Sequence, residues 1–306
     1  MGKISGFLEL LKEPLKIPSR NGKLMAITAS AYLILCSISL ILLFVSINPF
    51  ILDLSLKIMS LASARPGTPE YNQLLVAIRD DIGIFFGIEA AYMVLFYFIA
   101  LFAQTAIIVI ASCYYTDYDL SFKELILKVS KTWTRPLVTS IWVQLIAAGY
   151  ICFLILPFMV PSLLLFDHPT ILKTVLIILA IVFFTLYIYL SVVWSLGIVV
   201  SVIEDCYGFS ALAKARDLVN GKRVHGFLLS LLAILVMLVI VAIGSKFSPA
   251  MPIVVGVIQT LLTVVIGMFL LMAYTGFYYQ CKNGMMKSGG LEYSPVSTAH
   301  VDEYLP

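Results

Sequence analysis

The fold follows from residues 201–223, which read SVIEDCYGFSALAKARDLVNGKR and lie between two long apolar runs. This stretch holds seven charged residues, although charged residues make up only 12% of the chain. Phe209, Leu212 and Val219 follow a helical spacing, and Lys or Arg occupy much of the opposite side. A ligand-binding loop is one interpretation. The pattern favours the other, a short amphipathic helix in the membrane interface that follows a turn at Gly208.

The apolar runs around this stretch predict a membrane protein with six spans. Apolar residues make up 61% of the 306 residues, and the mean hydropathy is +1.03. About 20 helical residues cross the roughly 30 Å of hydrocarbon in a bilayer. The predicted spans cover about 24–47, 82–112, 137–162, 172–203, 226–245 and 251–279. The residues between the first two spans, 48–81, are expected to form an outer loop that ARPGTPE (64–70) interrupts, with short helices as candidates on either side of the break.

The distribution of basic residues predicts the orientation. Fifteen of the twenty Lys and Arg residues fall in the N-terminal segment, in segments 115–136 and 204–225, and in the tail. Basic residues near the ends of spans favour the cytosolic side. We therefore expect both termini in the cytosol, in an integral protein of the endomembrane system, with the endoplasmic reticulum as the favoured membrane.

The stretch that begins at Phe209 has two relatives within the chain, which begin at Phe7 and Phe122. In each, a leucine follows three residues later and a basic residue thirteen residues later. These basic residues are Arg20, Arg135 and Lys222. The fold class is therefore predicted as all-α, with three repeats of an interfacial amphipathic helix plus a transmembrane hairpin.

The repeats would divide a membrane domain of residues 1–282 into units of about 1–114, 115–205 and 206–282. Residues 283–306 are polar and lack apolar periodicity. They are predicted to form a disordered cytosolic tail.

Arg216 does not fit a purely structural helix, because it lies seven residues after Phe209 on the predicted apolar side. It could reach the headgroups along its aliphatic stem, pair with Glu204 or Asp205, or bind a lipid phosphate. Together with Lys222 and Arg223, it forms the candidate lipid-phosphate site.

Three of the five cysteines, Cys113, Cys206 and Cys281, fall at the predicted cytosolic ends of spans. They are either reduced thiols or sites of S-palmitoylation. The cysteines and the scattered histidines form no metal-ligand spacing, so the sequence predicts no metal site.

Glu89 lies well inside a predicted span, where an ionisable residue is costly and faces protein or water. Tyr150 and Gln259 fall at a similar predicted depth, so the three could form a polar cluster. Glu89 could tie helices together by hydrogen bonding, or it could act as an acid or base toward a substrate.

Several residues in the opening stretch resemble a family of plant multi-pass membrane proteins of largely unassigned function. They are Ile203-Glu204-Asp205, Tyr207-Gly208-Phe209, Arg216 and Gly221-Lys222-Arg223. That family is similar to the membrane domain found beside some glycerophosphodiester phosphodiesterases. The resemblance implies a six-helix endomembrane protein. It does not imply phosphodiesterase activity, which belongs to a separate soluble domain.

The sequence leaves three functions open, and no common catalytic or nucleotide-binding motif decides whether the protein is an enzyme. The first is a non-enzymatic scaffold, adaptor or membrane-organising protein. The second is an intramembrane enzyme that acts on a lipid or isoprenoid, with Glu89 as acid or base. The third is a transporter or lipid-handling protein.

We expect membrane lipids as partners, with cytosolic or membrane proteins as further candidates. No cofactor and no nucleic acid are expected, since a dense basic patch is missing.

Overall fold

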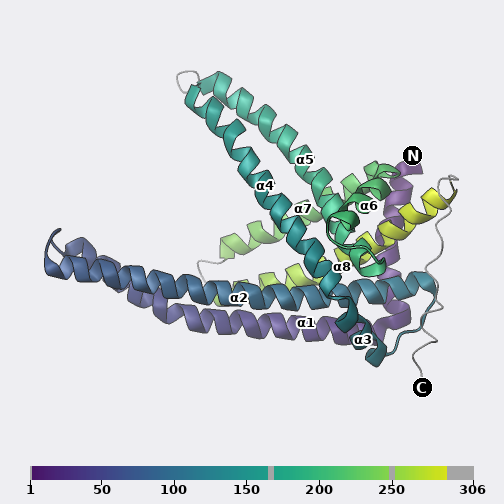
Figure 1. The fold of residues 1–306 in the computed structure, drawn as a ribbon, viewed down its shortest axis with the longest axis horizontal. Helices are drawn as coiled ribbons and strands as arrows, with labels where there is room; N and C mark the ends of the chain where they lie inside the picture. Colours follow the sequence, from purple (N-terminus) through teal and green to yellow (C-terminus); the bar gives the residue numbers. More distant parts are fainter. Residues whose placement is uncertain (1, 165–168, 248–251, 288–306) are drawn as a thin grey trace.

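The computed structural model describes residues 2–164, 169–247 and 252–287, which are almost entirely helical (Figure 1). The helices are α1 (Gly2–Ser63), α2 (Pro69–Thr116), α3 (Phe122–Thr132), α4 (Thr134–Leu164), α5 (Pro169–Ile203), α6 (Phe209–Asn220), α7 (Arg223–Phe247) and α8 (Pro252–Lys287). Six of these are long and apolar enough to cross a membrane, namely α1, α2, α4, α5, α7 and α8. The predicted all-α class with six candidate spans is confirmed.

The six long helices form three hairpins, α1–α2, α4–α5 and α7–α8, which leave a common packed region in different directions (Figure 1). We call this region the base. It comprises residues 101–116, 188–203 and 268–284 together with α3, α6 and the first turns of α1. Ile107, Leu196 and Phe277 are completely buried there.

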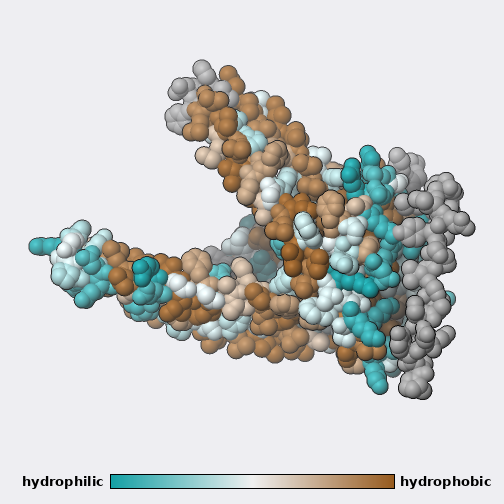
Figure 2. All heavy atoms as spheres, viewed as in Figure 1, coloured by the Kyte–Doolittle hydropathy of each residue, from teal (hydrophilic) through white to brown (hydrophobic). Residues whose placement is uncertain are grey.

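The hairpins beyond the base form three arms with exposed apolar side chains. Figure 2 shows this apolar surface on the α1–α2 and α4–α5 arms. In the most apolar part of α4, none of the residues is buried inside the protein. This is compatible with a membrane, because lipid chains cover apolar side chains as well as another helix does.

The α1–α2 arm is longer than its sequence suggests. The predicted break at ARPGTPE is confirmed, because α1 ends at Ser63 and α2 begins at Pro69. The flanking helices are longer than predicted, since they are continuous with the spans and leave only residues 64–68 as a loop. Thr68 caps α2 by accepting a hydrogen bond from the Tyr71 N–H at 3.3 Å. At 1.5 Å per residue, the span from Gly22 to Ser63 is about 63 Å long. It therefore tilts strongly or extends beyond the hydrocarbon of a bilayer.

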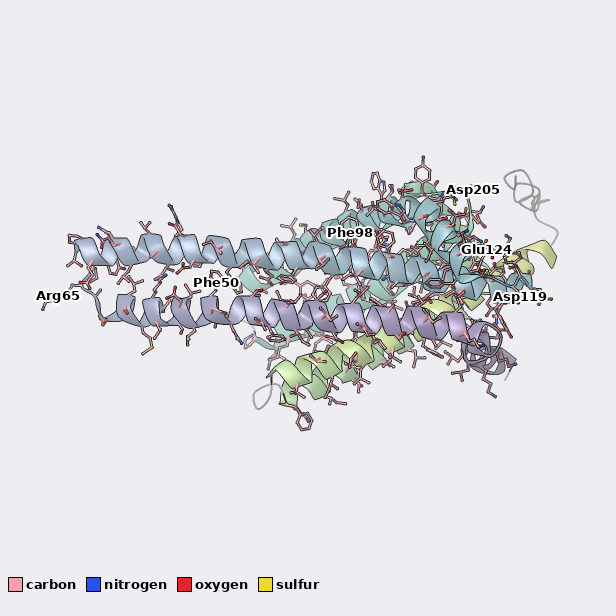
Figure 3. All side chains as sticks on the ribbon, turned by 90° about the horizontal axis from the view of Figure 1, so that it is seen from below. Phe50, Arg65, Phe98, Asp119, Glu124 and Asp205 are labelled. Carbon is pink, nitrogen blue, oxygen red and sulfur yellow. The ribbon has the colours of Figure 1, made fainter. Side chains whose placement is uncertain are left out.

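Charged and polar contacts hold the two helices of this arm together. Lys57 of α1 lies 2.5 Å from Asp81 of α2 and 2.7 Å from Asp53 on its own helix. Figure 3 shows Arg65 at the far tip of the arm, whereas Asp119, Glu124 and Asp205 gather at the opposite end, in and beside the base. Charged residues thus mark both ends of the molecule.

The first predicted interfacial helix is not a separate element, because α1 is helical from Gly2 onward. Its first turns run along the base before the helix bends into the arm (Figure 1). Pro14 and Pro18 fall in the sequence of this part of α1. A proline removes one backbone donor from a helix, which explains a bend in this part of α1.

The other two predicted short helices, α3 and α6, are separate elements. Asp117 ends α2 in the left-handed conformation, and Ser121 with Glu124 forms a capping box that starts α3. Gly208 has a φ of +64° and donates its N–H to Thr139 Oγ1 at 2.9 Å, which starts α6 after the turn.

The residues of the predicted apolar face of α6 divide between two sides of the helix. Leu212 and Val219 are buried, together with Ala211, Ala215 and Leu218, whereas Ala213 is exposed and Phe209 is 66% exposed. Gly197 lets α5 and α6 approach closely, since a Cβ atom on Gly197 would lie 2.6 Å from Leu212 Cδ2. Leu212 thus packs against α5, while Phe209 lies on the outward side of α6.

The same geometry recurs at the related stretches. The leucine three residues after each phenylalanine is buried in all three, as Leu10, Leu125 and Leu212. Phe122 is exposed like Phe209. The side chains of Phe7 and Arg20 lie outside the described residues, and the threefold repeat stays a prediction.

Residues 283–287 were predicted as part of a disordered tail, but they are helical, because α8 continues to Lys287. The remainder, 288–306, lies outside the described residues.

Candidate functional site

The structure does not bring Glu89, Tyr150 and Gln259 together. Tyr150 donates a hydrogen bond to the Phe183 carbonyl at 2.7 Å, within the α4–α5 arm. The Gln259 side chain packs against Gly244 of α7. Glu89 is half-buried in α2, and no hydrogen bond or ion pair within the described residues joins it to the other two. The hairpins diverge beyond the base, so a common depth does not place these residues in contact (Figure 1).

A different polar cluster lies where the three hairpins leave the base. A cavity of about 440 Å³ is bounded by α5, α7 and α8, with one residue from α2. Its polar lining residues are Gln104, Tyr187, Ser191, Ser195, Ser230 and Tyr274. The remaining lining is apolar, and two of these residues, Leu238 and Val241, are more than half exposed. The cavity therefore opens sideways, toward the space that lipid chains occupy.

Hydroxyl groups from three helices form a hydrogen-bonded chain in this cavity. The Ser191 and Ser230 oxygens are 2.6 Å apart, and the Ser230 and Tyr274 oxygens are 2.9 Å apart. Ser191 also donates to the Ile188 carbonyl at 2.9 Å. We call Ser191, Ser230 and Tyr274 the hydroxyl cluster.

Each hydroxyl of the cluster carries one hydrogen, and either oxygen of the Ser191–Ser230 and Ser230–Tyr274 pairs can be the donor. Ser195 forms a further side-chain hydrogen bond with Tyr274. The cluster can therefore both donate and accept hydrogen bonds.

Close helix packing positions the cluster. A Cβ atom on Gly226 of α7 would lie 2.9 Å from Val192 Cγ1 and 3.2 Å from Phe277 Cζ. Glycine thus allows α7 to touch both α5 and α8 at this level. One turn further along α7, Ser230 is 1% exposed and reaches both neighbouring helices.

The hydroxyl cluster was missed at the level of sequence. Serine is common in membrane helices, where its hydroxyl bonds to its own backbone, so a serine alone indicates no site. The available signal was the pair Ser191 and Ser195, which lie one turn apart on one face of a span.

A second polar group lies in the base, around the buried carboxylate of Glu204. Tyr278 donates a hydrogen bond to Glu204, and Lys214 forms an ion pair with it. Lys282 Nζ lies 4.0 Å from Glu204 Oε1. These contacts connect α5, α6 and α8.

The ion pairs at the base also bear on the alternatives for Arg216. Asp205 pairs with Arg135 at 2.6 Å, and Glu204 pairs with Lys214. No ion pair within the described residues joins Arg216 to either carboxylate. Arg216 is instead exposed on the same outward side of α6 as Phe209.

The other two residues of the candidate lipid-phosphate site also lie at the base. Arg223 is exposed and donates to Asn220 Oδ1 at 3.0 Å. Lys222 is half-buried, with its aliphatic stem near Gly284. Binding of a lipid phosphate by Arg216, Lys222 and Arg223 stays a prediction.

The candidate palmitoylation sites differ in accessibility. Cys113 and Cys281 are only 2% and 3% exposed and belong to the core of the base, which disfavours acylation of these two thiols. Cys206 is half-buried. Burial, and secondarily the nearby Glu204 carboxylate, raises the pKa of its thiol.

Three long apolar hairpins on a packed base define an α-helical multi-pass membrane protein with six candidate spans. A family model described as a domain of unknown function (DUF8558) matches residues 3–288, and the chain belongs to this family. Neither a curated protein nor a solved structure matches the chain.

Proposed function

We propose that the protein handles membrane lipids and that the cavity above the base receives the polar group of a lipid. The observation that carries this proposal is the hydroxyl cluster, which lies in a cavity that opens sideways between apolar arms. Hydrogen-bonding groups inside a membrane are satisfied by protein or by a ligand, because hydrocarbon offers no partners. A lipid can enter this cavity with its chains between the arms and its polar group against Tyr274.

Binding fits the cavity better than catalysis does. The described residues that line it include no Asp, Glu, His, Lys, Arg or Cys. A serine or tyrosine hydroxyl is a weak nucleophile without an adjacent base. The intramembrane enzyme with Glu89 as acid or base is therefore the less favoured proposal.

A membrane-organising role is a second candidate, which the outward surface of α3 and α6 supports. Phe122 and Phe209 are exposed, and Arg216 lies on the same side of α6 as Phe209. An exposed aromatic beside a basic residue suits the boundary between acyl chains and anionic headgroups. On this reading α3 and α6 would lie in the interface and bend or anchor the bilayer.

The orientation is part of the same proposal. Basic residues are concentrated at the base, so we place the base and both termini in the cytosol, in an endomembrane such as the endoplasmic reticulum. The resemblance to the plant family is consistent with this location and stays a prediction.

A glycosylation acceptor inserted between Arg65 and Thr68 tests the orientation, because glycosylation at the tip of the α1–α2 arm would place that tip in the lumen. An acceptor at the tip that stays unmodified in a folded protein would contradict the orientation.

Lipid binding is tested with purified protein in lipid nanodiscs and a lipid probe that carries a photoreactive acyl chain. We expect labelling that weakens in Ser230→Ala and in Tyr274→Phe. Tyr150→Phe is the matched control, because its hydroxyl bonds to a backbone carbonyl inside the α4–α5 arm, away from the cavity. Labelling that is equal in all four proteins would contradict the proposed function.

A further inference from the structure

We infer that the lipid in this cavity is uncharged and carries a free hydroxyl as its polar group, as diacylglycerols and sterols do. This inference rests on the proposed function and specifies the chemical class of its ligand. Three properties of the cavity support it: the lack of charge in its lining, the arrangement of its donors and acceptors, and its depth.

The lining of the cavity carries no charge. Its polar groups are hydroxyls and one carboxamide. At the base ends of α5 and α8 the nearest charged residues are Glu204 and Lys282, which lie 4.0 Å from each other. A phosphate or ammonium group in the cavity would lose its hydration without gaining an opposite charge from the lining, which is strongly unfavourable. A hydroxyl loses far less and regains hydrogen bonds.

The donors and acceptors of the cavity match a hydroxyl group. The hydroxyl cluster can donate or accept, because either oxygen of the Ser230–Tyr274 pair can supply the hydrogen of the bond between them. Gln104 faces the cavity from α2, and none of the hydrogen bonds found among the described residues involves its side chain. Its amide offers N–H donors. A hydroxyl can exchange hydrogen bonds with Tyr274 and accept from Gln104, whereas a quaternary ammonium can do neither.

The depth of the cluster also favours a neutral lipid. Ser230 is seven residues after Arg223, which corresponds to about 10 Å along α7 from the charged base. Tyr274 is eight residues before Lys282, about 12 Å along α8. A charged headgroup stays at the level of the charged base, because moving it inward would expose it to hydrocarbon. A lone hydroxyl can descend to this depth.

The test uses nanodiscs that contain the full protein and one of three probes with the same photoreactive chain: a diacylglycerol, a sterol, or a phosphatidic acid. We expect the diacylglycerol or the sterol to label peptides of α7 and α8. Labelling should fall about tenfold in Gln104→Leu and in Tyr274→Phe, as expected for the loss of one hydrogen bond. It should stay unchanged in Tyr150→Phe. The probe that labels identifies which of the two hydroxyl lipids is the source.

Two outcomes would overturn the inference, and they are distinguishable. If phosphatidic acid labels the same peptides as strongly and with the same dependence on Gln104 and Tyr274, the ligand class is wrong and the proposed function stands. If no probe shows labelling that depends on these residues, while all variants elute as single species in size-exclusion chromatography, the proposed function fails as well.

Discussion

The buried carboxylate of Glu204 should hold the base together, and the substitution Glu204→Gln tests this with little change in volume. Glu204 is 8% exposed, and Tyr278, Lys214 and Lys282 surround it. Asp205, the neighbouring carboxylate, has a side chain that is 72% exposed and pairs with Arg135. The two acidic residues thus provide a buried and an exposed ion pair at adjacent positions.

The expected cost follows from these contacts. A hydrogen bond to a charged group contributes about 1.5–3 kcal/mol. Glu204→Gln weakens two such contacts, from Lys214 and Tyr278, and Lys214 recovers part of its hydration because 27% of its side chain is exposed. We therefore expect a loss of about 2–3 kcal/mol. Asp205→Asn should cost about 0–1 kcal/mol, the usual range for an exposed pair.

The buried cysteine Cys113 provides the assay. It is 2% exposed in the base, so a thiol reagent reacts with it only when the base opens. A loss of 2–3 kcal/mol corresponds to labelling that is about 30- to 150-fold faster, and a loss of up to 1 kcal/mol to at most about fivefold. Labelling rates are measured in the same detergent by mass spectrometry of the Cys113 peptide. Equal rates for Glu204→Gln and Asp205→Asn would refute the reasoning.

Three further predictions concern packing, the long arm and the juxtamembrane thiol. Gly226→Ala should lower stability by about 1–3 kcal/mol, measured as a lower Tm, because its methyl group would overlap α5 and α8. Gly149→Ala is the control and should be neutral or slightly stabilising, because open space surrounds that residue. Equal effects of the two substitutions would contradict this packing. Lys57→Met should loosen the α1–α2 arm, so amide hydrogen exchange near Asp81 should accelerate by up to about fivefold. Unchanged exchange would show that the ion pair contributes nothing. Because burial raises the pKa of Cys206, its thiol stays protonated at neutral pH. Its alkylation rate should therefore keep rising with pH beyond the pH at which the rate of a free thiol levels off. A rate that levels off at or below the pH seen for glutathione would contradict the prediction.

The sequence predicts the class and the number of spans because both depend on local composition. A helix of about 20 apolar residues satisfies its own backbone, so each span is visible without knowledge of its neighbours. The turn at Gly208 was predicted for the same reason, since a glycine between a span and a polar helix has a local role. Leu10, Leu125 and Leu212 also gave a local signal, and each is buried.

The lengths of α1 and α2 and the outward side of α6 were predicted less well. Residues 48–63 and 69–81 lie outside the two apolar runs and were predicted as a loop, but Lys57 pairs with Asp81 across the hairpin and stabilises two continuous helices. Phe209 was placed on one apolar face with Leu212 because of their helical spacing. In the structure Leu212 is buried with Ala211 and Ala215, whereas Phe209 is exposed.

The candidate site shows most clearly where sequence reasoning ends. Glu89 was visible from the sequence because a carboxyl inside a span is rare, but its depth in one helix did not say which helices it meets. Ser191, Ser230 and Tyr274 are individually unremarkable, and they become a site only because Gly226 lets three helices meet at one level. Local residue chemistry thus determines that this chain is a six-span membrane protein. The directions in which the hairpins leave the base, set by close contacts between distant residues, decide which polar groups share a cavity.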